Sequence, residues 1–212
     1  MRILVSGLIA VSFLASSAFA GNVALLSLGA TATCGGTPAC NLSGYPAANT
    51  IDGTESYNGS GVDTDVWVAP GGTVSPYLLI NLGQLYTVDS VTISGQGNPG
   101  YTIGFEVFVG GAADSTAALL LSSGTQITPG TVVQTDGIRN ALWSDTFSVS
   151  PASKIEYVLL DVTQSNSTGN PTWEDAGAAE ITVDAVPEPG TLGLIGAGLL
   201  ALGFTRRSRT RK

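Results

Sequence analysis

The central part of this chain is predicted to fold as an all-β domain, a sandwich or barrel of short strands. Between residues 77 and 183, runs rich in β-branched and aromatic residues alternate with short segments of Gly, Pro, Asn, Asp and Ser. This part of the sequence has no long stretch with the apolar repeat of an amphipathic helix. Both observations are typical of strands that are joined by turns and packed in two layers.

The first 20 residues are predicted to be a secretory signal peptide. Arg2 precedes an apolar run over residues 3–14, and the small residues that follow end in Ala18-Phe19-Ala20, an A-x-A cleavage signal. The apolar run is too short for a membrane-spanning helix. We expect the mature protein to begin at Gly21; the alternative is a buried N-terminal helix.

The two cysteines, Cys34 and Cys40, enclose the short segment Gly-Gly-Thr-Pro-Ala. In an exported protein they are expected to form a disulfide that closes a small loop. A metal site made from two thiolates is the alternative, and it is disfavoured because the chain contains no histidine.

The next elements are one helical turn and two strands. Residues 46–51 suit a helical turn, and Asp52-Gly53 has the composition of a tight turn. Strands are predicted over residues 77–82 and 87–94, which are short β-rich runs. In the first, Leu78, Ile80 and Leu82 alternate with the intervening residues, and Gly83 ends the strand.

The strand pattern is strongest over residues 103–109, where every odd-numbered residue is apolar. Gly104, Glu106 and Phe108 fall on the other face, which we expect to lie mostly in solvent. Residues 113–121 are ambiguous: their Ala and Leu suit a helix, but the short length and the flanking glycines favour a strand and a turn.

Further strands are predicted over residues 131–134, 143–149, 155–163 and 178–183. Within the third of these the alternation gives way to Tyr157-Val-Leu-Leu160, which predicts a strand buried on both faces.

The charge balance of the central segment excludes several kinds of partner. Residues 21–186 hold fifteen acidic residues and two basic ones, Arg139 and Lys154. Such a charge repels nucleic acid and anionic membrane surfaces, and it suits divalent cations or neutral ligands. The alternative is that the acidity only keeps an exported protein soluble.

No catalytic residues are predicted. The absence of histidine excludes Ser-His-Asp and Cys-His arrangements. Two carboxylate pairs could imitate a glycosidase dyad. Glu174 and Asp175 are adjacent, so in a strand they would point to opposite faces, and Asp63 and Asp65 have the i, i+2 spacing of turn acids or cation ligands. Nothing in the sequence marks a cleft between two carboxylates.

The C-terminal segment, residues 186–212, has three parts. The motif Pro187-Glu188-Pro189 is followed by 14 mostly apolar residues, 191–204, and then by a basic cluster over residues 206–212. As a helix the apolar run spans about 21 Å, less than the roughly 30 Å of a hydrocarbon core. The basic cluster is expected to stay in the cytoplasm.

This three-part tail resembles the PEP-CTERM sorting domain of Gram-negative bacteria. The resemblance implies recognition by a membrane-embedded exosortase, cleavage near the motif, and delivery to the cell surface or an extracellular polysaccharide matrix. Contact with the membrane would then be transient and limited to the C-terminal helix. An ordinary C-terminal anchor is the alternative.

Residues 30–184 resemble the discoidin, or coagulation-factor C-type, domain. The resemblance rests on the order of Asp52-Gly53, Trp67 and the segments 77–83, 88–93, 104–109, 157–160 and 178–183. It implies a galactose-binding-like jelly-roll β-sandwich over residues 21–185, a fold that also occurs in carbohydrate-binding modules.

The resemblance also implies a structural Ca²⁺ where the Asp-Gly turn meets the last strand. Carried over by residue, its ligands are Asp52 and Glu180, with Asp65 in a place that the family usually gives to Thr or Ser. An insertion over residues 54–62 separates Asp65 from the turn. Carboxylate and carbonyl oxygens are the ligands that Ca²⁺ prefers.

Ligand binding is expected on aromatic side chains in loops, because the apolar face of a sugar packs on an aromatic ring. Trp173 lies in a polar loop just ahead of the last strand, and Tyr57 and Tyr101 lie in Gly- and Asn-rich segments. Arg139 is a candidate for reading a sugar hydroxyl, although no arginine aligns with the one that the family often uses. Trp67 and Trp143 are expected in the core.

Two functions follow as hypotheses. The first is a non-catalytic carbohydrate-binding protein of the cell surface or matrix. The second is a structural component of a matrix or biofilm that has no specific small ligand.

Overall fold

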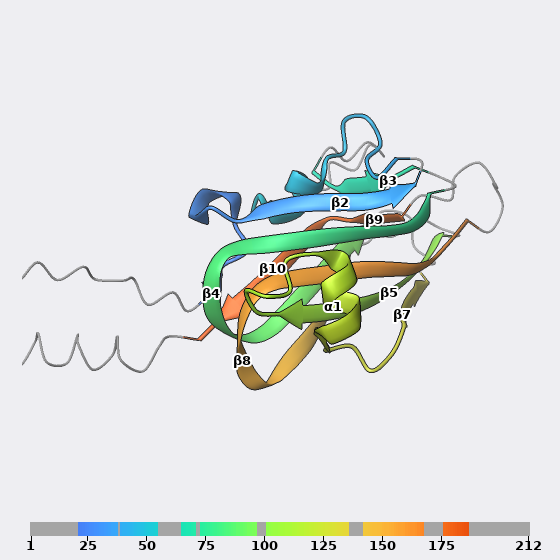
Figure 1. Cartoon of the computed structure of the whole chain (residues 1–212). Coiled ribbons are helices and arrows are strands. Elements are labelled where there is room, and N and C mark those ends of the chain that lie inside the picture. Colours follow the sequence, from blue (N-terminus) through green and yellow to red (C-terminus); the bar gives the residue numbers. More distant parts are fainter. Residues whose placement is uncertain are drawn as a thin grey trace, which may run out of the picture. The chain divides into compact units, whose positions relative to one another are not determined.

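The fold is organised by two long strands that run antiparallel to each other and that both bend. The computed structural model describes residues 21–37, 39–54, 65–70, 73–96, 101–135, 142–167 and 176–186, all within one compact unit, Phe19–Val186. Strands β4 (Val74–Gln96) and β8 (Leu142–Ser167) pair along most of their length. The sequence predicts each of them as two separate strands, whereas in the structure each continues through a bend (Figure 1).

The bend in β4 comes from the local chemistry of Asn81-Leu82-Gly83. Gly83 has φ +80°, a left-handed conformation that glycine adopts without strain. The Oδ1 atom of Asn81 accepts a hydrogen bond from the backbone N–H of Gly83 at 2.7 Å, as in an Asx turn. The register with β8 shifts between Asn81 and Tyr86, so the two halves of β4 enter different layers.

One layer contains the first half of β4 and the second half of β8. On one side β4 pairs with β2 (Thr31–Thr37), and on the other side β8 pairs with β5 (Tyr101–Gly110). The short strands β6 (Thr125–Gln126) and β7 (Val132–Thr135) pair with β5.

The other layer contains the second half of β4 and the first half of β8. Here β4 pairs with β10 (Glu180–Ala185), which in turn pairs with β1 (Gly21–Asn22). Strands β3 (Trp67–Ala69) and β9 (Ala176–Ala178) form a separate two-stranded sheet.

The main hydrophobic core is made by inward-facing side chains of these strands. In β5 the predicted alternation is observed, because Phe105, Val107 and Val109 are buried. The largest fully buried side chains of this core are Trp67, Phe105, Ile51, Leu78, Ile80, Leu82, Ile93, Leu160 and Ile181.

Two short 3-10 helices lie before the bent strands in sequence. They are η1 (Leu26–Leu28) and η2 (Ala47–Ile51), and η2 agrees with the helical turn predicted over residues 46–51. Helix η2 packs against β2, β3 and β10, with Ile51 fully buried. Among the described residues, no helix has the length and apolar character needed to cross a membrane.

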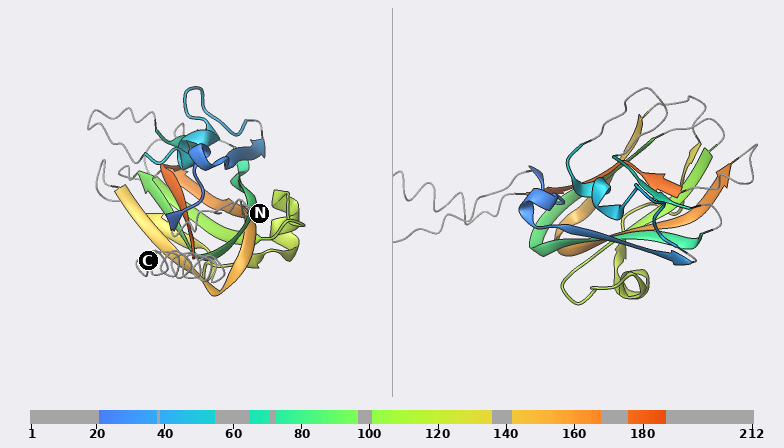
Figure 2. Two further views of the ribbon diagram at one scale, coloured as in Figure 1. Left: turned by 90° about the vertical axis from the view of Figure 1, so that its left-hand side faces the viewer. Right: turned by 90° about the horizontal axis from the view of Figure 1, so that it is seen from above.

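The α-helix α1 (Ala117–Ser123) lies outside the strands, on the outer face of the sheet (Figure 2, right). The strand and turn predicted over residues 113–121 are therefore wrong. A hydroxyl cap starts the helix: Oγ1 of Thr116 accepts a hydrogen bond from the N–H of Leu119 at 3.2 Å. The apolar side of the helix is anchored by Leu120, which is fully buried.

A second, smaller hydrophobic cluster lies under α1. It contains Leu120 and Ala117 of the helix, Phe108 of β5 and Leu159 of β8. Because α1 covers this part of the sheet, β8 is buried on both faces, as residues 157–160 predict. Phe108, which the alternation assigns to a mostly solvated face, is 8% exposed for the same reason.

Candidate functional site

Several strands have an end at the same side of the sheet, where connecting segments join them. We call this side the loop end. Gln96 pairs with Leu142, and Tyr101 pairs with Ser167. Segments 97–100, 136–141 and 168–175 therefore all connect strands at this end.

Most of the predicted ligand-binding residues belong to connecting segments. Arg139 is in segment 136–141 and Trp173 in segment 168–175, and both lie outside the described residues, as does Tyr57. Tyr101 begins β5 at the loop end, and the position of its side chain is not described.

The two described termini of the domain lie at the opposite end. Gly21 pairs with Ala185, and the N–H of Val186 donates to the carbonyl oxygen of Thr87 at 2.8 Å. Thr87 is nine residues along β4 from Gln96, which corresponds to about 30 Å of strand. The sorting motif Pro187-Glu188-Pro189 follows directly and lies outside the described residues.

The three predicted calcium ligands lie on neighbouring elements. Glu180 begins β10 and is 3% exposed. Asp52 follows η2, is exposed, and accepts hydrogen bonds from the backbone N–H and the hydroxyl of Thr54. Asp65 is half-buried and lies two residues before Trp67.

These carboxylates do not form a three-ligand cluster. Among the described residues, no three Cys, Asp or Glu side chains gather closely enough to hold a metal ion. A calcium ion near Glu180 would therefore need backbone carbonyl oxygens as well, which are common calcium ligands. Helix η2, which leads into Asp52, does pack against β10.

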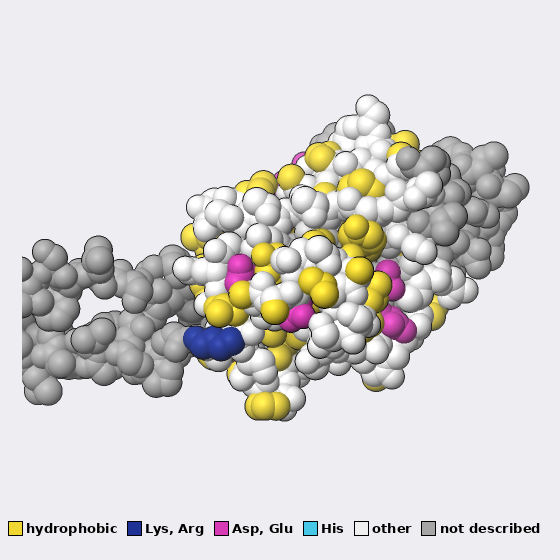
Figure 3. Space-filling view, viewed as in Figure 1, with side chains coloured by type: hydrophobic (Ala, Val, Ile, Leu, Met, Phe, Trp, Pro, Cys, Tyr) yellow, Lys and Arg dark blue, Asp and Glu magenta, His cyan; other side chains and the backbone are white. Residues whose placement is uncertain are grey.

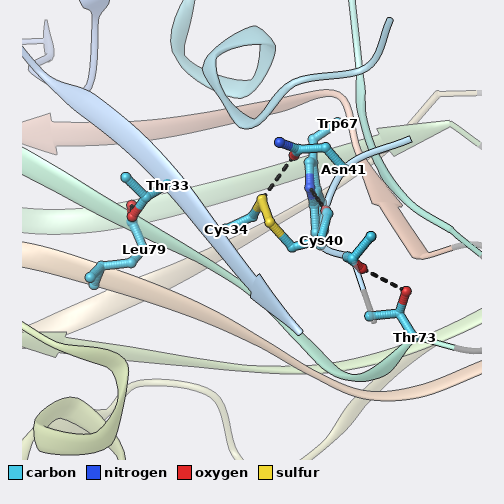
Figure 4. The surroundings of a disulfide bond; sticks show 8 residues. Thr33, Cys34, Cys40, Asn41, Trp67, Thr73 and Leu79 are labelled. Carbon is cyan, nitrogen blue, oxygen red and sulfur yellow. Dashed lines mark hydrogen bonds between the residues drawn. A yellow bond between two sulfur atoms is a disulfide. The ribbon is translucent and has the colours of Figure 1, made fainter. Parts of the chain in front are cut away.

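The disulfide fastens the middle of β2 to the segment that follows the strand (Figure 4). Cys34 and Cys40 are joined with an S–S distance of 2.04 Å. The carbonyl oxygen of Cys40 accepts a hydrogen bond from Nε1 of Trp67 at 2.8 Å, and the hydroxyl of Thr73 donates to the carbonyl of Ala39 at 2.9 Å. These bonds hold the disulfide loop against the start of β3 and β4.

The tryptophans assigned to the core differ in burial. Trp67 is fully buried. Trp143 is half-buried and stacks on Phe105, with ring centroids 5.7 Å apart.

The structure also contains a polar row that the sequence analysis missed. On the outer face of the sheet, Tyr77 of β4 lies opposite Asp161 of β8, and Asp161 lies opposite Glu106 of β5. Burial raises the pKa of Asp161, and the negative charge of Glu106 raises it further. Alternation alone assigns Glu106 to the outer face, but only the strand register brings the three residues into one row.

The sorting tail is supported by a family match. Residues 185–208 match the model of the PEP-CTERM protein-sorting motif. The motif marks an exported protein that is sorted through the membrane and implies processing by an exosortase. The match begins at Ala185, the last residue of β10. No curated protein matches the chain by sequence.

The domain has the fold of known carbohydrate-binding modules. It is similar to the family 32 module from C. perfringens NanJ in complex with galactose, with 19% identity, a TM-score of 0.50, and coverage of 73% of this chain and 92% of that one. It is also similar to a variant of chitosan-binding module 1 from a chitosanase/glucanase of Paenibacillus sp. IK-5, with 20% identity, a TM-score of 0.51, and coverage of 79% and 100%. A third similar structure is the CpGH89CBM32-4 module produced by Clostridium perfringens, with 19% identity, a TM-score of 0.51, and coverage of 77% and 98%. The predicted jelly-roll β-sandwich is thereby confirmed, and nothing in these likenesses points to catalysis in this chain.

Proposed function

We propose that this protein is an exported, non-catalytic carbohydrate-binding protein, displayed on the cell surface or in the extracellular matrix after an exosortase has processed its tail. The sorting motif supports the export route. The likeness to modules described with galactose and as chitosan-binding supports carbohydrate as the ligand class.

The observation that carries the proposal is the arrangement of the two ends of the sandwich. The connecting segments that hold Trp173 and Arg139 join strands at the loop end, whereas Val186, which precedes the tail, is at the other end. The point where the tail is attached and the loop end are therefore at opposite ends of the sandwich, and loops carried by a stable scaffold are common binding sites.

A glycan array tests the proposed binding. The full chain, purified in mild detergent, is expected to bind a defined set of glycans, and Trp173→Ala is expected to weaken that binding about tenfold or more through loss of the aromatic contact. Trp173→Phe is the matched control, because it keeps an aromatic ring and should retain most of the binding. A wild-type chain that binds no glycan would contradict the proposal.

We further propose a structural Ca²⁺ held by Glu180, Asp52 and backbone carbonyl oxygens. Glu180 supports this, because a buried carboxylate is a hard oxygen ligand already removed from bulk water. The ion would tie the Asp52 turn to the start of β10 and would take no part in any reaction.

Thermal unfolding with calcium and with a chelator tests the calcium proposal. A ligand that binds only the folded state, present at one hundred times its Kd, stabilises it by about 2.7 kcal/mol. We expect calcium to raise the midpoint of the wild type but not that of Asp52→Ala/Glu180→Ala. Asp89→Ala, a change at an exposed acid on β4, should keep the calcium response. No response in the wild type would remove the calcium site.

A structural role in a matrix or biofilm is the second candidate. It is favoured by the excess of acidic over basic residues and by the lack of an arginine aligned with the family's sugar-reading arginine. This role predicts that loss of the protein alters the cohesion of the matrix while the purified chain binds no defined sugar.

A further inference from the structure

We propose that the outer face of the sheet carries a second ligand site, built from Tyr77, Asp161 and Glu106, for a sugar that bears a protonated amine. This site is separate from the loop end and goes beyond the function proposed above, which depends on Trp173.

Tyr77 supplies an aromatic platform. A Cβ atom added at Gly35 would lie 2.1–2.4 Å from atoms of the Tyr77 ring end, so the ring lies across the backbone of β2 in space that only glycine leaves. Tyr77 precedes the fully buried Leu78 and is itself half-buried on the outer face. A ring that rests on backbone and remains partly open to solvent can pack against the C–H face of a sugar.

The carboxylates stand in one row with this ring. Asp161 lies between the buried residues Leu160 and Val162, so its side chain points outward toward the same face as Tyr77. Glu106 is its directly paired neighbour on β5. Neighbouring strands lie about 4.8 Å apart. Because the ring lies over β2, the row from the ring across β4 and β8 to Glu106 on β5 spans about 14 Å, a length suited to two or three sugar rings.

Charge favours an amine over a neutral or acidic group. Ionised carboxylates only accept hydrogen bonds, and an ammonium group offers three donors. Burial and the charge of Glu106 raise the pKa of Asp161, so a cation placed between the two carboxylates would relieve an existing repulsion. An anionic sugar would add to that repulsion.

The rest of this face fits the same ligand. Figure 3 shows several acidic side chains on the face that carries α1, and basic atoms only at the far left of the described surface in that view. Lys154 is the one Lys or Arg among the described residues, and it pairs with Thr87 near the termini. The hydroxyl of Thr131 donates to Oε1 of Glu106 at 2.9 Å, which holds that carboxylate in place.

Isothermal titration calorimetry with the full chain in mild detergent tests the proposal. The probes are a glucosamine oligomer and the N-acetylated oligomer of the same length. We expect the wild type to bind the amine form about tenfold more tightly, because a charge-assisted hydrogen bond contributes on the order of 1.4 kcal/mol or more. Glu106→Gln/Asp161→Asn should abolish this preference, and the exposed-acid variant Asp89→Asn should keep it.

Two further variants test the platform. Tyr77→Ala should weaken binding of both oligomers, and Gly35→Ala should do the same because the new methyl group displaces the ring. Spermidine, an amine without a sugar ring, should bind more weakly than the glucosamine oligomer. Circular dichroism of each variant verifies that the fold is intact.

The results that would overturn the site are distinct from those that would overturn the proposed function. Equal binding of both oligomers by the wild type, no binding of the amine form, or a preference that survives Glu106→Gln/Asp161→Asn would each reject the site. Amine-dependent binding that is lost in Trp173→Ala but kept in the Tyr77 and carboxylate variants would also reject it and would assign that binding to the loop end. Trp173-dependent binding of other glycans would leave the proposed function intact.

Discussion

Asp161 and Glu106 form a pair of like charges on adjacent strands, without a basic residue opposite either of them. Asp161 is opposite Tyr77 on its other side. Like charges at directly paired positions of antiparallel strands destabilise a sheet. A natural sequence that keeps such a pair on an open face carries a local cost to stability, which a cationic ligand would offset.

Replacing Asp161 by Asn should therefore stabilise the free protein at neutral pH. Because the folded-state pKa of Asp161 is raised, its stabilising contribution is present below the unfolded pKa and is lost as pH rises through the folded pKa. We expect Asp161→Asn to increase the free energy of unfolding by a few tenths to about 1 kcal/mol at pH 7.

Urea unfolding at a series of pH values measures this effect. The difference between Asp161→Asn and the wild type should shrink as pH falls below the ordinary range of aspartate. Asp89→Asn, at an exposed acid outside the row, should show little difference at any pH. A destabilised Asp161→Asn variant at pH 7 would contradict the assigned cause of the pKa shift.

At the scale of elements, α1 shows how a tertiary contact decides a local structure. The helix has only seven residues, which is too short to be stable alone in water. It persists because Leu120 is buried against Phe108 and Leu159. Leu120→Ala should lower the free energy of unfolding by about 2–4 kcal/mol.

The neighbouring Leu121 provides the control for this prediction, since its side chain is 48% exposed. Leu121→Ala should change stability by less than about 0.5 kcal/mol in equilibrium unfolding. If Leu120→Ala and Leu121→Ala change the free energy of unfolding by similar amounts, Leu120 does not anchor α1.

The same helix marks the limit of what the sequence could predict. The alternation of apolar residues correctly predicts which side chains of β5 face the core, because the direction of a side chain in a strand depends only on the two-residue period. It could not predict α1 in place of a strand, since residues 113–121 favour the helix only once Phe108 and Leu159 offer an apolar surface. The ring of Tyr77 over Gly35 and its alignment with Asp161 likewise depend on strand register, which a single sequence does not contain.

At the scale of the whole molecule, the side chain of Asn22 helps to join the beginning of the domain to its end. Oδ1 of Asn22 accepts hydrogen bonds from the N–H of Ala24 at 2.9 Å and from the N–H of Val183 at 3.1 Å. The first bond is local, and the second links β1 to β10, the last strand before the tail.

Asn22→Ala should weaken the attachment of β1 to β10, because it leaves the partly buried N–H of Val183 without its hydrogen-bond acceptor. We expect a loss of about 1–3 kcal/mol in stability and faster hydrogen exchange at the amide of Val183. Asn22→Asp, which keeps an acceptor oxygen, should retain most of the protection. Unchanged exchange at Val183 in Asn22→Ala would show that β1 does not depend on this side chain.

The attachment of the tail to β10 also determines how the domain would bear mechanical load. A pull between the tail and a ligand held at the loop end would act along the strands, because the two points lie at opposite ends of the sandwich. The hydrogen bonds between β10 and β4 run across that direction over six paired residues, from Glu180 to Ala185. They would be sheared together instead of opening one after another, so the sandwich would resist a load applied in this direction.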